Sequence, residues 1–278
     1  MMNLFYDVSQ QCSKITTEKY STSFSSAIKL LHKDIRTPIY NIYGFVRFAD
    51  EIVDTFHDFN RSALLNQFKQ ETYVAFERGF SLHPILNSFQ ITVNQYKIEH
   101  NLIDAFFTSM ELDLTKSKYD NQGYNDYIYG SAEVVGLMCL YIFCEGDKAL
   151  YNKLKIYAQS LGAAFQKVNF LRDLKADTEN LERMYFPGCD FNNFSEFEKR
   201  NIEADIQNDF SKAYEGIIKL PLNARFGVYV AYKYYLSLFR KIKKLQAKRV
   251  MEERIRIPDY GKVMIVAKAG VRSQLNIL

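Results

Sequence analysis

Residues that break helices are scarce in this chain. It has only five prolines and twelve glycines among 278 residues, so we expect few turns and long elements between them. Apolar residues recur at helical spacing through most of the sequence, and strand-like alternation is scarce. We therefore predict an all-α fold, with a single domain over residues 1–278 and helices around a central cavity. The predicted helices are 3–14, 19–31, 35–55, 60–77, 85–112, 124–143, 147–178, 194–215, 221–247 and 260–268.

One predicted helix carries a stripe of polar side chains beside apolar ones. Asn169, Asp173 and Asp177 are spaced i, i+4 and i+8, and Gln166 extends the stripe at its start. A carboxylate beside apolar surface needs a cation or several hydrogen-bond donors. The alternative is an ordinary solvated helix face. The flanking apolar residues are Leu161, Phe165, Val168 and Leu171.

A second predicted helix carries acids at the same spacing. Asp50 and Asp54 are i and i+4 in the segment 40–54, with Glu51 between them and Arg47 one turn earlier. If the two acidic helices face each other, their carboxylates point into a shared cavity. Oxygen ligands, with few histidines and no clustered cysteines, favour Mg²⁺ over zinc or iron. Protein-bound Mg²⁺ usually bridges to the phosphates of a substrate.

The composition and the absent motifs narrow the function classes. A net charge of +4 does not favour nucleic-acid binding. The four cysteines form no CxxC pair, which argues against a zinc site or a disulfide framework and favours the reducing cytoplasm. The N-terminus lacks the pattern of a secretory signal, and the longest charge-free apolar run, 134–144, is too short to span a bilayer. Peripheral contact with the inner membrane stays open.

Three further segments have both a structural and a functional interpretation. The hydroxyls of the segment YSTSF (20–24) either cap a helix or donate to phosphate oxygens. The tyrosine- and glycine-containing segment 124–136 indicates either tight helix packing or a helix that bends beside a bulky ligand. Near the C-terminus, either a charged region or a clamp for a diphosphate is formed by Tyr235, Arg254, Arg256 and Lys262.

Together these segments resemble the squalene and phytoene synthase family, over roughly residues 15–262. The first aspartate-rich motif of the family matches DEIVD at 50–54, and the second matches NFLRDLKAD at 169–177, followed by RMYFP at 183–187. The hydroxyl segment, the tyrosine-containing helix and the C-terminal positions also match. Either acidic motif alone is a weak signal, whereas the pair, about 120 residues apart, is specific.

The resemblance implies an isoprenoid synthase fold and a role for each matched residue. The implied ligands of Mg²⁺, for which Mn²⁺ is a possible substitute, are Asp50, Glu51, Asp54, Asn169, Asp173 and Asp177. The residues implied in catalysis are Asp50, Asp54, Asp173, Asp177, Arg47 and Tyr127. The residues implied in substrate binding are Ser21, Ser23, Phe24, Arg47, Gln166, Asn169, Tyr235, Arg254 and Lys262.

The implied reaction joins two prenyl diphosphates head to head. Loss of one diphosphate leaves an allylic cation, which the double bond of the second chain attacks to give a cyclopropylcarbinyl diphosphate. A second ionisation, rearrangement and proton loss then give a hydrocarbon. Family members that reduce the intermediate with NADPH are longer and often end in a membrane anchor, so NADPH is not expected here. We expect a monomer or a weak dimer, with membrane contact only for product release.

Within this family, the chain most resembles the bacterial phytoene synthases of carotenoid biosynthesis. Ile28 follows Phe24 by one turn and shortens the expected pocket less than an aromatic residue would, which favours geranylgeranyl diphosphate (C20) as substrate and phytoene (C40) as product. One alternative is a synthase of C30 squalene, dehydrosqualene or hydroxysqualene. The other is a noncatalytic helical assembly protein of the same fold.

The sequence departs from the family pattern at three places. Glu51 replaces a second adjacent aspartate and keeps the charge. Lys175 and Ala176 stand where the family usually has Gly and an acid, which removes one carboxylate. Glu133 stands where the family commonly has Gly, and it either faces another helix or adds a polar group near the reacting carbons.

Overall fold

The computed structural model of the chain describes residues 2–116, 118–181, 183–189, 194–252 and 254–274, without the side chains of 177–181, 259, 273 and 274. Within these ranges the elements are helical, apart from one isolated bridge between Lys118 and Met184, which confirms the predicted all-α class. In chain order they are α1 (Met2–Tyr20), α2 (Thr22–Ile28), α3 (Lys33–Asp54), α4 (Arg61–Arg78), α5 (Pro84–Tyr96), α6 (His100–Thr115), α7 (Asn121–Ile128), the π-helix η1 (Tyr129–Glu133), α8 (Val134–Phe143), α9 (Lys148–Leu181), α10 (Glu196–Ile217), α11 (Leu222–Lys243), α12 (Ala247–Glu252) and α13 (Asp259–Gln274).

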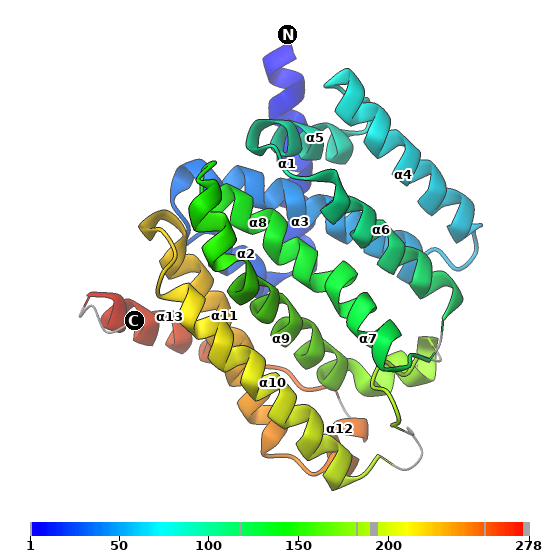
Figure 1. Ribbon diagram of the computed structural model, residues 1–278, viewed down its shortest axis with the longest axis vertical. Helices are drawn as coiled ribbons and strands as arrows, with labels where there is room; N and C mark the ends of the chain where they lie inside the picture. Colours follow the sequence, from blue (N-terminus) through cyan, green and yellow to red (C-terminus); the bar gives the residue numbers. More distant parts are fainter. Residues whose placement is uncertain (1, 117, 182, 190–193, 253, 275–278) are drawn as a thin grey trace.

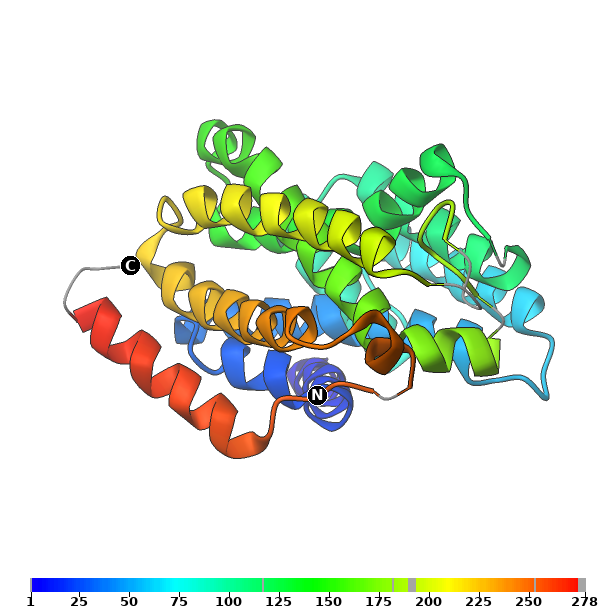
Figure 2. The same cartoon turned by 90° about the horizontal axis from the view of Figure 1, so that it is seen from below.

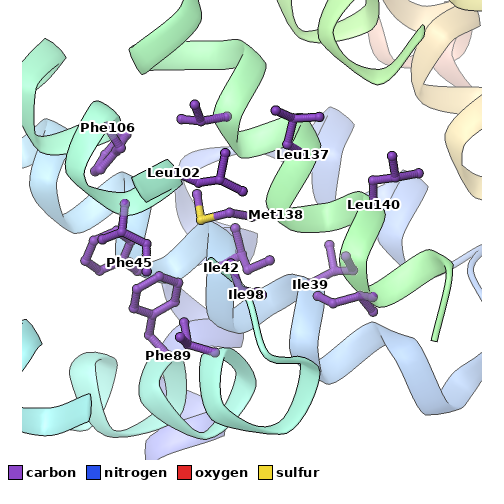
Figure 3. Packing of buried hydrophobic residues seen from close by; sticks show 14 of the residues in the cluster. Ile39, Ile42, Phe45, Phe89, Ile98, Leu102, Phe106, Leu137, Met138 and Leu140 are labelled. Atoms are coloured by element: carbon purple, nitrogen blue, oxygen red, sulfur yellow. The ribbon is translucent and has the colours of Figure 1, made fainter. Parts of the chain in front are cut away.

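The helices pack around two apolar cores. In the first, α3 packs against α1, α5 and α8, and Phe45 of α3 stacks on Phe89 of α5 with ring centroids 3.8 Å apart (Figure 3). In the second, α9, α10 and α11 pack around Phe210 and Phe239. Figure 1 shows α9, α10 and α11 running side by side below the α3, α6 and α8 layer. Residues from both cores line the cavity described below.

Two predicted helices are interrupted. The predicted helix 85–112 is two helices, because Lys97 adopts a left-handed conformation (φ 52°) that ends α5 and turns the chain into α6. The predicted helix 124–143 contains η1, a π-helical segment. At Gly130 in η1 a Cβ atom would lie 2.5 Å from the carbonyl oxygen of Ala105, so only glycine allows η1 to approach α6 this closely.

The ends of several helices also differ from the prediction. The expected gap between 14 and 19 is absent, because α1 continues to Tyr20 and the break falls at Ser21, whose side chain accepts a hydrogen bond from the Phe24 N–H and caps α2. The last predicted helix, 260–268, extends to Gln274. None of the described helices combines the length and apolar character needed to cross a bilayer.

Candidate active site

A long apolar cavity of about 400 Å³ runs between the helices, within the size range of small-molecule sites. Its walls come mainly from α2, α3, α8, α9 and α11. Along α9 they reach from the apolar Leu154 to the polar Asp173, nineteen residues further on, or about 28 Å at the rise of an α-helix. The cavity thus joins a cluster of acids to a deep apolar space.

Two opposing helices supply these acids. Asp50 and Asp54 lie on the last turns of α3, and Asp173 lies on α9, where Gln166 and Asn169 also line the cavity. The i, i+4 spacing in each helix places its polar groups on one side, as the sequence predicted for Asp50, Asp54 and Asp173. Asp177 follows one turn later on α9, and its side chain lies outside the described residues.

Two arginines bind Asp173. The Arg172 Nε lies 3.1 Å from both carboxylate oxygens of Asp173, and the Arg254 Nε donates to Asp173 Oδ1 at 2.7 Å. Arg254 belongs to the segment between α12 and α13, so the C-terminal region reaches the acidic end of the cavity. This contact brings together two residues that the sequence placed in one site.

A third arginine, in the segment after α9, links α3 to α6. The Arg183 Nη1 donates to Asp54 Oδ1 at 3.0 Å and lies 3.5 Å from Asp113 Oδ1, while its Nη2 donates to the Asp113 carbonyl at 2.7 Å. The Tyr127 hydroxyl donates to Asp113 Oδ2 at 2.8 Å, and Tyr185 contacts the same arginine. All five side chains line the cavity.

Asp113 was not among the residues predicted for the site. This residue lies on α6, seven positions after the buried Phe106 and three after the buried Met110, and it is only 7% exposed. A carboxylate at a position where the helical period requires an apolar residue is the signal that could have found it. Its Oδ1 is buried and accepts no hydrogen bond, and the Arg183 guanidinium 3.5 Å away supplies the opposite charge.

Burial changes the acidity of these groups. Burial, and then the charge of Asp54, raises the pKa of Asp50 to about 7, against the opposing effect of Arg47. Burial raises the pKa of Asp113 to about 8, although the Arg183 charge opposes it. Burial also raises the pKa of the Tyr127 phenol well above its ordinary value, so Tyr127 keeps its proton. A nearby cation would favour the ionised carboxylates.

The donor set fits a hard divalent cation. Asp50, Asp54 and Asp173 offer carboxylate oxygens to the cavity, which is the ligand type that Mg²⁺ prefers. No three His, Cys, Asp or Glu residues of the described chain are grouped closely enough to hold a metal by themselves. Such a sparse set is compatible with Mg²⁺, which usually keeps several waters and binds one or two carboxylates together with substrate phosphates.

Glu51 and Arg47 lie behind the cavity wall. Glu51 pairs with Arg47 and accepts a hydrogen bond from Thr55 at 2.9 Å, and neither Glu51 nor Arg47 lines the cavity. Arg47 lies 3.9 Å from Asp50 and stacks on Tyr20, with its guanidinium 4.4 Å from the ring centroid. The structure therefore separates Glu51 from the cavity-facing aspartates, while Arg47 stays beside Asp50.

The remaining predicted binding residues fall into two groups. Phe24 and Tyr235 form part of the cavity wall with Phe165, which stacks on Tyr235 at 3.9 Å, and the Tyr235 hydroxyl lies 3.3 Å from Asn169 Oδ1. The second group lies near the start of α2, outside the cavity lining: Ser21 caps α2, Ser23 lies in its first turn, and the Lys262 Nζ donates to Thr22 Oγ1 at 2.8 Å.

Glu133 faces another helix. It does not line the cavity, and its Oε2 accepts a hydrogen bond from the Gln159 Nε2 of α9 at 2.9 Å. Burial raises the pKa of Glu133, while this hydrogen bond and the nearby Lys167 oppose the change. Of the two interpretations offered by the sequence, the structure supports the helix–helix contact.

An all-α arrangement around an apolar cavity, with acids opposed at one end, is the isoprenoid synthase fold. A crystal structure of a dehydrosqualene synthase in complex with a ligand superposes with a TM-score of 0.83 at 19% identity, covering 97% of this chain and 98% of that one. A squalene synthase structure from Alicyclobacillus acidocaldarius gives a TM-score of 0.73 at 19% identity, covering 86% and 94%. These likenesses establish the fold.

Sequence comparison then gives the family. The squalene/phytoene synthase family model matches residues 17–260, so the chain belongs to this family, whose members are prenyltransferases that condense prenyl diphosphates head to head. A 4,4'-diapophytoene synthase from Staphylococcus haemolyticus is 28% identical over 212 residues, or 74% of this chain and 72% of the relative. A phytoene synthase from Arthrospira platensis is 24% identical over 295 aligned positions, or 97% and 94%.

Proposed function

We propose that this chain condenses two molecules of geranylgeranyl diphosphate to phytoene through a cyclopropylcarbinyl diphosphate. The observation that carries this proposal is the cavity itself, which joins Asp50, Asp54 and Asp173 to a deep apolar space and extends along about 28 Å of α9, from Leu154 to Asp173. Such a site suits a substrate with a diphosphate at one end and a long hydrocarbon tail. Because the acids of both motifs line this cavity, we favour an enzyme over a noncatalytic assembly protein of the same fold.

The acidic end would bind and release the diphosphate. Asp50, Asp54 and Asp173 would hold Mg²⁺, which when bound neutralises the charge of the diphosphate and makes it a better leaving group. Arg172 and Arg183 line the same end of the cavity and supply fixed positive charge for phosphate oxygens. The ion pairs that these arginines form with the aspartates would rearrange as substrate binds.

The apolar walls would protect the carbocations. Phe24, Phe165 and Tyr235 present ring faces and edges within 6 Å of one another, and aromatic rings stabilise nearby positive charge. The walls also exclude water, which would otherwise quench the allylic cation. Burial raises the pKa of the Tyr127 phenol well above its ordinary value, which disfavours a Tyr127 phenolate as the base, and we assign the final proton transfer to the departed diphosphate.

The preference for C20 over C15 substrates rests on Ile28. This residue is 4% exposed and lines the cavity one turn after Phe24, where an aromatic ring would occupy more of the space. Each additional CH₂ group that the wall covers contributes about 0.8 kcal/mol to binding. A pocket that admits the five extra carbons therefore favours the longer tail.

A C30 synthase is the second candidate. The relative from Staphylococcus haemolyticus is named as a diapophytoene synthase, and the ligand-bound structure described above is a dehydrosqualene synthase. Purified protein given equal concentrations of the C15 and C20 diphosphates with Mg²⁺ distinguishes the two candidates by product mass. We expect C40 hydrocarbon to dominate. A pool dominated by C30 hydrocarbon would overturn the chain-length proposal and leave head-to-head condensation standing.

A further inference from the structure

Helix α13 is apolar on two opposite sides. Its inner side packs on the second core through Ile265, Val266 and Ala269. Its outer side carries exposed Tyr260 (76%), Val263 (69%), Met264 (54%) and Val271 (58%), at spacings that form one stripe along the helix. A helix that is apolar all round is normally covered on all sides. No described part of the chain covers this stripe, which we call the outer face of α13.

The C-terminal region that contains this face is strongly basic. Residues 222–274 contain thirteen Lys or Arg and three Asp or Glu, a net charge of +10, whereas the whole chain carries +4. The residues before 222 therefore carry a net charge of −6. Such asymmetry is typical of a surface that binds a polyanion or an anionic membrane. Four exposed cations occupy the end of α11 alone, at Arg240, Lys241, Lys243 and Lys244.

These cations lie beside the start of α13. The Lys241 Nζ donates to the carbonyl of Arg256, just before α13, and the Arg272 Nη1 lies 3.4 Å from the Tyr229 hydroxyl near the start of α11. The two helices are thus antiparallel, and the basic end of α11 adjoins the Tyr260 end of the outer face. Figure 2 shows α13 along the margin of the molecule, next to α11. Lys268 is exposed on the flank of the same stripe.

The start of α13 also lies near the cavity. Arg254, five residues before α13, binds Asp173 in the cavity wall, and Lys262 in the first turn of α13 binds Thr22 at the start of α2. Phe24, two residues after Thr22, lines the cavity. The first turn of α13 therefore lies near the acidic end of the cavity.

We propose that the outer face of α13, with the basic end of α11, docks this protein on an anionic lipid surface. Aliphatic and aromatic side chains enter the boundary between headgroups and acyl chains, and neighbouring lysines and arginines bind anionic headgroups. A second copy of the chain fits less well, because a symmetric interface would bring two strongly basic surfaces together. Nucleic acid would use the cations but would leave the apolar stripe uncovered.

Vesicle co-sedimentation of the full chain tests this proposal, with vesicles of equimolar phosphatidylglycerol and phosphatidylcholine and with phosphatidylcholine alone. Val263→Ser/Met264→Ser shortens the apolar stripe, and Lys244→Glu/Lys268→Glu removes positive charge. Leu4→Ser/Val8→Ser on α1 is the matched control, because it removes exposed apolar side chains far in sequence from the basic region. Circular dichroism and a thermal melt check that each variant is folded.

We expect the wild type and the α1 control to partition onto the anionic vesicles, and each of the other two variants to partition at least about tenfold more weakly. Equal binding to phosphatidylcholine alone, no loss in either variant, or an equal loss in the α1 control would overturn the proposal. The proposal would also be overturned if the stripe and charge variants differed from the wild type only in oligomeric state, measured by sedimentation velocity. Because partitioning is measured without substrate, it is independent of turnover. Failure to bind vesicles leaves the proposed reaction standing, and failure of the reaction leaves vesicle binding to be judged separately.

Discussion

Asp113 is a charged residue in a position that the helical pattern reserves for an apolar one. It lies between Arg183 and Tyr127, and it accepts the Tyr127 hydroxyl proton in a hydrogen bond of 2.8 Å. Burial raises its pKa to about 8, while an exposed aspartate in the unfolded chain titrates near 4. The folded protein therefore binds a proton at Asp113 through much of the range between these values.

This shift predicts a pH dependence of stability. Because the pKa of Asp113 is higher in the folded than in the unfolded state, its contribution to stability is greatest below about pH 4 and is lost as the pH rises to about 8. Asp113→Asn resembles the protonated form and keeps an acceptor for Tyr127. We expect the variant to lose less unfolding free energy than the wild type between pH 5 and pH 8, measured by urea denaturation in EDTA. Equal losses would contradict this account, and Asp58→Asn, an exposed position, serves as the control.

The sequence identified the acids of both motifs that line the cavity, but not their partners. Helical spacing alone placed Asp50 with Asp54, and Asn169 with Asp173, on the sides where they lie. The same spacing also joins Arg47 to Glu51 across one turn, and Glu51, one residue after Asp50 on the helix, does not line the cavity. Asp113 and Arg183 come from distant segments, and their contact depends on tertiary packing that no local pattern records.

At the scale of single elements, the helices were predictable where breakers are scarce. α9 extends without interruption from Lys148 to Leu181, close to the predicted 147–178. The break between α5 and α6 was missed because it falls at Lys97, a residue type that gives no signal for a left-handed conformation. The π-helical form of η1 was not predicted, but the tight packing that the sequence offered as one interpretation of 124–136 is present, because Gly130 lies close against α6.

The contact between α9 and α10 depends on a glycine that can be tested. A Cβ atom at Gly216 would lie 2.2 Å from the Tyr157 Cβ, and Tyr157 lines the cavity. Gly216→Ala must therefore push the two helices apart, and we expect it to lower the unfolding free energy by about 1–3 kcal/mol in urea denaturation. The matched control is Gly270→Ala on α13, where a Cβ would meet nothing within 4 Å.

The control should behave in the opposite way. Alanine has the higher helix propensity, so Gly270→Ala should leave stability unchanged or raise it by up to about 1 kcal/mol. If Gly216→Ala is as stable as the wild type, the α9–α10 contact tolerates more space than the structure shows. In that case the substitution at Gly216 would not displace Tyr157 and would leave the cavity wall unchanged.

At the scale of the whole molecule, the fold brings together acidic motifs that lie about 120 residues apart in the chain. The all-α class and the presence of a cavity followed from periodicity and scarce breakers. The placement of α3 and α9 on opposite walls could not be predicted from the sequence pattern, because it is set by the packing of both apolar cores around the cavity. The contact of Arg254 with Asp173 likewise depends on the C-terminal segment returning to α9.

Diphosphate release from geranylgeranyl diphosphate tests most directly whether these opposed acids form one ionisation site. The comparison is between Asp173→Asn and Asp126→Asn, an exposed acid on α7, at the same Mg²⁺ concentration and with the fold checked by circular dichroism. We predict that Asp173→Asn lowers the rate by about a hundredfold or more, because it removes a charge that would hold the cation, while Asp126→Asn keeps the wild-type rate. Full activity of a folded Asp173→Asn protein would contradict the assignment of the site.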